Sequence, residues 1–300
     1  PGLSTYLFFL MVSIFAYWQI SFLQYSVQWD MLDAYLPWRC FAGDCIQNGQ
    51  LPLWNPYQHL GYPIHADLRS AWYPEVFLLG LTFGYSNITI HFLYILYISI
   101  AGYGMSKLAG IFKIESFVAI IVGIAYMLSG FFICHGQDLG FIISAAFIPW
   151  TLYYYLLFTK EPNIRNLLKT AFLFLLLIFG AYPAFTISTI YFLTIIFIVS
   201  GFSTGIFSDK IRFLRAIKYH IYLALIIVLG SSVLIITYMQ VGPWVERLGG
   251  LTYEKASYNP LSPQSLLSWI LPFGMVNNSE LFKTDISMNN AYWGLIMIVF

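Results

Sequence analysis

The chain alternates long apolar runs with polar connections, and the runs have the length of membrane-spanning helices. A helix needs about 20 apolar residues to cross the hydrocarbon of a bilayer. Seven runs approach that length and an eighth begins near residue 291; the seven cover residues 3–23, 88–107, 116–134, 141–158, 167–182, 184–202 and 219–240. The pattern predicts an all-α fold, in which residues 1–300 form a single polytopic transmembrane helix bundle. Because the chain starts with Pro1-Gly2 and stops inside an apolar run, we expect it to be the N-terminal part of a longer protein.

The polar segments between these runs include two long ones, residues 24–74 and 241–290. The first is rich in tryptophan and tyrosine, which is untypical of disorder, and a long connection inside a compact protein is usually functional. Within it, residues 31–47 are expected to form an amphipathic helix on the membrane surface. Two apolar segments, 75–84 and 265–273, are too short to span and are expected to be re-entrant or interfacial helices.

Composition points the same way. Hydrophobic residues make up 59% of the chain and charged residues 9%, whereas a soluble domain carries about a quarter charged residues. Lipid must therefore solvate much of the apolar surface. The net charge is only +1, so nucleic acid is not an expected partner, because its binding needs a concentrated basic surface.

The charges also predict an orientation. Lys and Arg accumulate in the cytoplasmic loops of membrane proteins. Nine of the fourteen basic residues fall in three short connections that alternate correctly with the spans: Lys107, Lys113, Lys160, Arg165, Lys169, Lys210, Arg212, Arg215 and Lys218. Only three of the thirteen acids lie there, Glu115, Glu161 and Asp209. We therefore expect both long loops on the outer, periplasmic or extracellular face, where the polar chemistry gathers.

Two acids of the first loop are candidate catalytic groups. Asp30 follows the first span, and Asp33 comes three residues later, so on a helix the two carboxylates would share a face. Two partly buried like charges raise each other's pKa, which suits a general base. The alternative is a pair of solvated loop acids, one of which caps a helix.

Other side chains of the two loops could bind a ligand. Arg39 and Arg69 offer planar guanidinium groups that fit phosphate oxygens, although arginines at this level also reach lipid headgroups. Trp54 and Trp72 lie in the turn-rich part of the loop and are candidate sugar platforms, while most other aromatic residues fit an interfacial belt. His65, Asp67, His135 and Asp138 are candidate polar contacts, or helix caps. No spacing among the His and Asp residues matches a zinc motif, so we expect no cofactor and treat a divalent metal as a minor alternative.

Several motifs of the first loop and its sequel occur together: Pro37-Trp38-Arg39 after Asp30, Gly49-Gln50-Leu51-Pro52-Leu53-Trp54-Asn55-Pro56, Gly61-Tyr62-Pro63-Ile64-His65-Ala66-Asp67, Tyr73-Pro74, Ser129-Gly130-Phe131-Phe132, His135-Gly136-Gln137 and Pro149-Trp150. In these motifs the chain resembles the YfhO family of bacterial membrane proteins. That family is similar to the GT-C superfamily of polytopic glycosyltransferases, which take sugar from a polyprenyl-phosphate carrier on the outer face of the membrane.

The resemblance implies a bacterial inner-membrane protein that transfers sugar from a polyprenyl-phosphate donor to a cell-envelope acceptor. It places the catalytic acid just after the first span, where Asp30 stands, with Asp33 as the alternate. The charge of the leaving phosphate would be held by Arg39, Arg69 or Arg247. Two rival functions stay open: a transporter or flippase for a lipid-linked or anionic substrate, and a non-catalytic protein of envelope assembly. The near absence of charge inside the spans favours the enzyme over the transporter.

Overall fold

The computed structural model describes residues 2–67, 71–180, 182–245, 250–258, 260, 262–271, 290 and 292–294. Helices dominate this part of the chain, and its only β pairing is an isolated bridge between Asn55 and Tyr62. The predicted eighth span, which begins near residue 291, and the candidate ligands Arg69 and Arg247 lie outside the described residues.

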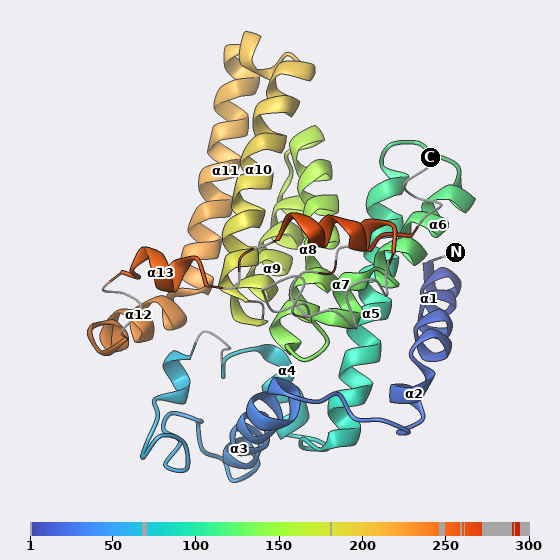
Figure 1. Cartoon of the computed structure of the whole chain (residues 1–300). Helices are drawn as coiled ribbons and strands as arrows, with labels where there is room; N and C mark the ends of the chain where they lie inside the picture. The colour runs from blue at the N-terminus through green and yellow to red at the C-terminus, as the bar shows by residue number, and fades with distance from the viewer. Residues whose placement is uncertain are drawn as a thin grey trace.

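The helices follow one another along the chain, and the connection from α3 to α4 is long (Figure 1). They are α1 Gly2–Ala16, α2 Trp18–Ser21, α3 Leu36–Gln47, α4 Pro74–Gly80, α5 Asn87–Gly110, α6 Ser116–Met127, α7 Gly130–Cys134, α8 Leu139–Lys160, α9 Ile164–Gly180, α10 Pro183–Ser203, α11 Lys210–Gly230, α12 Ser232–Val241 and α13 Tyr253–Ala256. A π-helical turn, Met31–Tyr35, leads into α3, and 3₁₀ turns cover Ile64–Ala66, Ile206–Ser208, Gly242–Trp244 and Pro263–Trp269.

Among the described residues, five helices are long and apolar enough to cross a membrane: α5, the α6–α7 pair, α8, α10 and α11. The described chain is thus all-α, as predicted, and has several helices that could span a bilayer, as a multi-pass membrane protein requires. The predicted spans 3–23 and 167–182 correspond to the shorter helices α1 and α9, of 15 and 17 residues. The short predicted helices are also found, 75–84 as α4 and 265–273 as the turn Pro263–Trp269.

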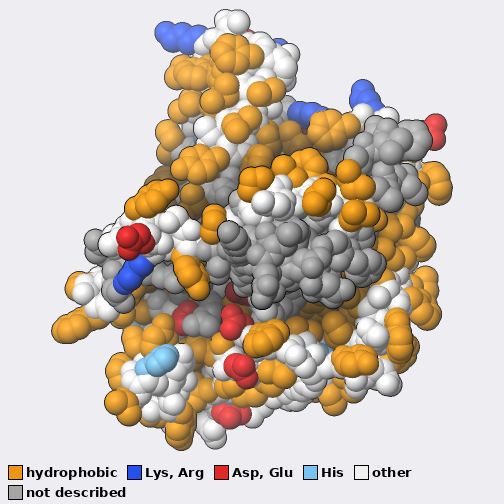
Figure 2. All heavy atoms as spheres, viewed as in Figure 1, with side chains coloured by type: hydrophobic (Ala, Val, Ile, Leu, Met, Phe, Trp, Pro, Cys, Tyr) orange, Lys and Arg blue, Asp and Glu red, His pale blue; other side chains and the backbone are white. Residues whose placement is uncertain are grey.

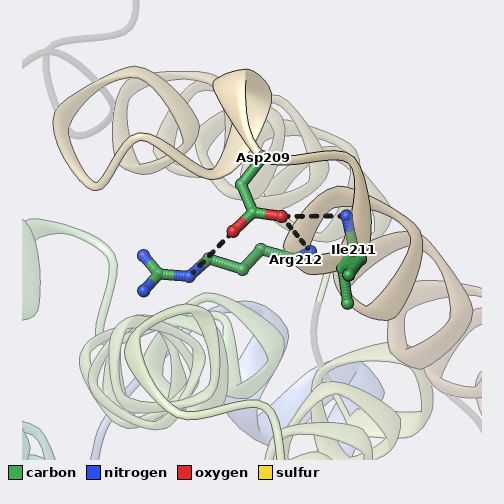
Figure 3. Close-up of polar contacts among 3 residues, drawn as sticks. All are labelled: Asp209, Ile211 and Arg212. Carbon is green, nitrogen blue, oxygen red and sulfur yellow. Dashed lines mark hydrogen bonds and ion pairs between the residues drawn. The ribbon is translucent and has the colours of Figure 1, made fainter.

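The predicted span 219–240 is wrong in its limits. The crossing helix is α11, which begins at Lys210, and a break at Ser231 separates it from α12. Asp209 fixes the start, because its carboxylate accepts hydrogen bonds from the backbone N–H groups of Ile211 and Arg212 and forms an ion pair with the Arg212 side chain (Figure 3). An aspartate at this position satisfies amides that have no partner inside the helix. The basic residues 210–218 therefore belong to a helix and not to a loop.

The main core lies around α5, whose membrane-length window is 61% buried. Residues from α1, the first loop, α6, α7 and α8 pack against it. Small residues allow the closest approach, since a Cβ atom on Gly123 of α6 would lie 2.5 Å from the carbonyl oxygen of Gly102 on α5. Small residues at such crossings let the backbones of membrane helices approach one another.

A second, smaller core joins the ends of α8 and α9 to α10 and α11. The windows of α10 and α11 are only 11% buried, although their hydropathy equals or exceeds that of α5. The two helices form the long hairpin at the top of Figure 1, and the rings of Phe197 and His220 join them with centroids 4.5 Å apart. Their exposed apolar faces are what a lipid-facing hairpin requires.

Proline interrupts the hydrogen bonding of α8 without ending the helix. Pro149 has no N–H group, so the carbonyl of Ala145 loses its helical donor. The hydroxyl of Tyr126 on α6 donates to that carbonyl at 3.0 Å. The next residue, Trp150, donates its indole N–H to the carbonyl of Ile100 on α5 at 3.0 Å. Side chains of neighbouring helices thus hold α8 at its proline.

The helix predicted at 31–47 exists, and one of its faces packs into the protein core. Its inward face is formed by Met31, Tyr35, Trp38, Ala42 and Ile46, all buried in the main core. The amphipathic prediction gave the helix an apolar side of Leu32, Tyr35, Leu36 and Phe41. Of these, Tyr35 is buried and the other three are only partly buried. The helix therefore packs against the protein along a stripe that includes one of the four predicted positions.

The charged side chains separate along the bundle. Lys and Arg gather mainly towards the upper end of Figure 2, and most acidic side chains lie in its lower part. We call the end that carries Asp30, Asp33 and Asp138 the acidic end, and the end that carries Lys107 and Lys160 the basic end. The separation is the one that the loop charges predict.

Candidate functional site

The candidate site lies at the acidic end, where the first loop meets the start of α8. Asp138 caps α8: one carboxylate oxygen accepts the N–H of Gly140 at 2.8 Å and that of Phe141 at 3.3 Å. The same oxygen accepts the hydroxyl of Tyr35 at 2.6 Å. The cap thus ties α8 to the helical turn that precedes α3.

Asp138 is half-buried, and burial raises its pKa above the ordinary value of an aspartate. The hydrogen bonds from Tyr35, Phe141 and Gly140 act in the opposite direction, because they favour the charged form. The carboxylate of Asp30 adds to the rise through charge repulsion. The structure therefore brings together two acids that lie in different outer segments of the sequence.

Asp30 and Asp33 both stand at the start of the turn Met31–Tyr35, and both side chains are exposed. A tuned base of the predicted kind requires a partly buried pair of acids at these two positions. The half-buried member of an acid pair is instead Asp138, and Asp30 is its neighbour. Asp30 keeps the accessible position that a base needs to reach an acceptor hydroxyl.

Arg39 of α3 is completely buried. Its guanidinium carbon lies 5.0 Å from the ring centroid of Trp38 and 5.7 Å from that of Tyr73. Among the described residues, none of its three side-chain nitrogens finds a hydrogen-bond acceptor, and neither does the indole nitrogen of Trp38. Buried donors are nearly always paired, so a group of unpaired donors marks a place that an anion or water would satisfy.

The charge of Arg39 is balanced from α4. Burial disfavours the charged guanidinium, but the Glu75 carboxylate and nearby tyrosines hold the pKa of Arg39 above its ordinary value. The carboxylate accepts hydrogen bonds from the hydroxyls of Tyr85, at 2.8 Å, and Tyr97. A hydrogen bond of 3.1 Å links the hydroxyls of Tyr97 and Tyr73. Besides the exposed acids, the first loop and α4 therefore contribute a buried cation and a half-buried carboxylate.

The candidate sugar-binding residues of the first loop mainly contact other residues of the same loop. Trp54 is exposed and packs on Gly61, which has a positive φ of 123°. His65 contacts the carbonyl of Leu53 through Nδ1 at 2.6 Å and accepts at its own carbonyl the indole N–H of Trp72 at 2.9 Å.

Trp72 and Asp67, the other two sugar-binding candidates of this loop, are also held by protein contacts. Trp72 stacks on Phe77 of α4, with the planes 22° apart, so one face of its ring is covered. Asp67 is buried and accepts the hydroxyl of Tyr62 at 3.0 Å. Of this loop, Trp54 keeps the accessible ring face that stacking on a sugar requires.

His135 joins the site through aromatic stacking. Its ring lies between Phe131 and Phe141, with centroid distances of 4.4 and 5.1 Å, and Phe141 in turn stacks on Tyr182. Beside this ladder is a cavity of about 250 Å³, lined by Tyr126, Ser129, Phe131, Ala145, Ile148, Phe185, Asn290, Tyr292 and Trp293. His135 is buried, and its carbonyl accepts the backbone N–H of Asp138 at 3.0 Å.

Sequence reasoning did not identify Tyr35 or Glu75 as site residues. Glu75 follows Tyr73-Pro74, and a proline at the start of a helix with an acid in its first turn does predict the N-terminus of α4. Nothing in the local pattern shows that this acid faces a buried arginine. Within the described residues, no group of three or more His, Cys, Asp or Glu side chains could hold a metal ion.

No family model, curated protein or solved structure matches the chain. The resemblance to the YfhO family therefore stays a prediction that depends on the motifs of the first loop.

Proposed function

We propose that the protein is a membrane glycosyltransferase that moves a sugar from a polyprenyl-phosphate carrier to a cell-envelope acceptor. In this proposal the chain is a GT-C-like bundle of a bacterial cytoplasmic membrane, with seven spans and its acidic end outside. The observation that carries the proposal is the pair of accessible Asp30 and half-buried Asp138 at that end. Tyr35, which donates its hydroxyl to Asp138, also lies near the buried charge of Arg39. Carboxylates near a guanidinium are the groups that base-assisted loss of a phosphate leaving group requires.

Asp30 serves as the general base and takes the proton of the acceptor hydroxyl. The acceptor oxygen bonds to the anomeric carbon as the bond from that carbon to the phosphate oxygen breaks, through an oxocarbenium-like state. The bonding electrons leave with the polyprenyl phosphate. Asp33 is the alternate base, because it occupies the same exposed turn.

The phosphate charge is assigned to Arg39, with Arg69 and Arg247 as further candidates. The three nitrogens of Arg39 find no acceptor in the part of the chain that the structure describes, and a phosphate oxygen would satisfy them, which supports this role. Since Arg39 has no exposed surface, a phosphate reaches it only when the side chains in front of it move aside. The sugar is assigned to Trp54, Trp72, His65, Asp67, His135 and Asp138.

Transfer of radiolabelled sugar from polyprenyl-phosphate-linked donors tests the proposal. We expect Asp30→Asn to lower the transfer rate by at least about 100-fold, the usual contribution of a general base. Asp44→Asn is the matched control, an exposed acid of α3 in the same loop. Asp33→Asn tests the alternate. Normal transfer by both Asp30→Asn and Asp33→Asn would exclude both bases.

A transporter or flippase for an anionic lipid-linked substrate is the second candidate. Complete burial of Arg39 near Glu75 favours it, because ionisable groups buried inside membrane proteins mark substrate paths. Fluorescent polyprenyl phosphate in liposomes separates the two functions. If the lipid moves between leaflets and no sugar is transferred, the protein is a transporter and the glycosyltransferase proposal is wrong.

A further inference from the structure

A second cavity lies at the basic end of the bundle, far along α5 from the acidic site, and its volume is about 520 Å³. It opens between the first turns of α1 and α6, the last turns of α5, and α8. Its polar lining consists of Thr5, Tyr103, Ser106, Lys107, Ser116 and Tyr153. A cavity with one cation and several hydroxyl groups offers many donors to a single anionic group.

The cation of the cavity is Lys107, in the last turn of α5. Its ammonium group lies 5.3 Å from the ring centroid of Tyr103, which holds the side chain along the cavity wall. Lysine is a frequent phosphate ligand, and it binds as a point charge with three donors. The hydroxyl groups of the lining can complete the contacts to the remaining oxygens.

The start of α6 adds a second favourable element at the same place. Ser116, the first residue of this helix, lines the cavity, and the preceding Glu115 side chain makes no capping hydrogen bond. The first amides of α6 are therefore not capped by that side chain. The positive end of the helix dipole at this start favours an anion.

The rest of the cavity is apolar. Ile111 and Ile114 of the α5–α6 connection line it, and so does Ile120 of α6. A free phosphate would leave this surface in contact with water, whereas a phosphate ester with an attached hydrocarbon chain would cover it. Basic pockets between membrane helices bind lipid headgroups in this way.

We propose that this cavity binds the phosphate group of an anionic phospholipid from the leaflet at the basic end, with Lys107 as the main ligand. The site is separate from the proposed glycosyltransferase site and does not depend on it. The lipid would also bridge α1, α5 and α6, whose ends meet there.

Native mass spectrometry of the full chain tests the proposal, with phosphatidylglycerol as the probe and diacylglycerol of the same acyl chains as the lipid without phosphate. We expect phosphatidylglycerol to bind and diacylglycerol not to bind. Lys107→Gln should weaken binding about fivefold, the effect of one lysine near a headgroup, and Lys107→Arg should retain it. Lys169→Gln is the control, because Lys169 also stacks on a tyrosine, at 4.7 Å from Tyr154, but does not line the cavity.

If Lys107→Gln and Lys169→Gln weaken phosphatidylglycerol binding equally, the cavity is not the binding site. Equal binding of phosphatidylglycerol and diacylglycerol would also contradict the proposal. Inorganic phosphate that binds in a Lys107-dependent manner, without phosphatidylglycerol binding, would overturn the lipid as the ligand. If Lys107→Gln does not fold, Ser116→Ala removes an exposed hydroxyl at the edge of the cavity. That variant should also weaken phosphatidylglycerol binding, and unchanged binding would contradict the proposal.

Discussion

Two helices begin with the same device in opposite regions of the molecule. Asp138 caps α8 at the acidic end, and Asp209 caps α11 at the basic end; each carboxylate accepts two backbone N–H groups. Each region also contains an arginine. Arg212 is exposed and pairs with Asp209 at 3.4 Å (Figure 3), whereas Arg39 is buried between aromatic rings.

The difference lies in the surroundings of the two caps. The side chains of Asp209 and Arg212 are 45% and 67% exposed, so water screens their ion pair, and the Asp209 carboxylate acts mainly as a cap. Asp138 is half-buried, receives a third hydrogen bond from Tyr35 and lies near Asp30. A capping motif therefore fixes where a helix starts, while burial decides whether the pKa of the capping carboxylate is shifted and whether it can take part in a reaction.

The largest effect should come from the two arginines. Arg39→Met removes the cation that balances Glu75, and loss of one partner of a buried charge pair costs about 3 kcal/mol in the free energy of unfolding. Arg212→Met should change it by less than about 0.5 kcal/mol. Equilibrium unfolding of the purified variants in detergent measures both.

The double variant Arg39→Met with Glu75→Gln sharpens this test, because it removes the carboxylate that the first change leaves uncompensated. It should be more stable than Arg39→Met alone. Equal stability of the single and double variants would show that Arg39 and Glu75 do not interact.

Removal of the two capping aspartates should change the free energy of unfolding by amounts that differ less than those for the two arginines. Asp138→Ala loses the cap of α8, about 1 kcal/mol, and leaves the Tyr35 hydroxyl without its acceptor, about another 1 kcal/mol. Asp209→Ala loses a cap alone and should cost about 1 kcal/mol. The unfolding measurement in detergent applies again, and equal costs would remove the distinction between the two regions.

The smallest effect is a shift in titration. Because the Asp30 charge helps to raise the pKa of Asp138, Asp30→Asn should lower the pKa of Asp138, and the carboxylate should ionise at lower pH. Infrared spectra of the carboxyl band at a series of pH values follow this change. Asp33→Asn is the control. A pKa of Asp138 that moves with Asp33→Asn but not with Asp30→Asn would contradict the arrangement of the acids.

The helices were largely predictable, because apolar runs of membrane length are plain in the sequence. The start of α11 was missed since its first turns, Lys210 to Lys218, alternate charged and apolar residues and resemble a loop. Asp209 before them was a capping signal that hydropathy does not weigh. Hydropathy also did not separate core from lipid-facing helices, since α10 exceeds α5 in hydropathy and is far less buried.

The site was predictable in its residue types but not in its arrangement. Asp30, Arg39 and Asp138 were all candidates, yet the contact between the first loop and α8 is long-range and leaves no local pattern. The buried stripe Met31, Tyr35, Trp38, Ala42 and Ile46 has helical spacing in the sequence. Applied there, that periodicity would have placed Arg39 beside the buried face.

Pro149 has a consequence for the order of assembly. The Ala145 carbonyl lacks a hydrogen-bond donor until a side chain reaches it, because the lipid around the helix has no donors to offer. Tyr126, which supplies the donor, stands earlier in the chain, so the ribosome has already made α6 when α8 enters the membrane. Because synthesis proceeds from the N-terminus, Tyr126 is already in place when the Ala145 carbonyl enters the membrane. A circular permutant that placed α8 ahead of α6 would expose the unmet carbonyl to lipid during insertion.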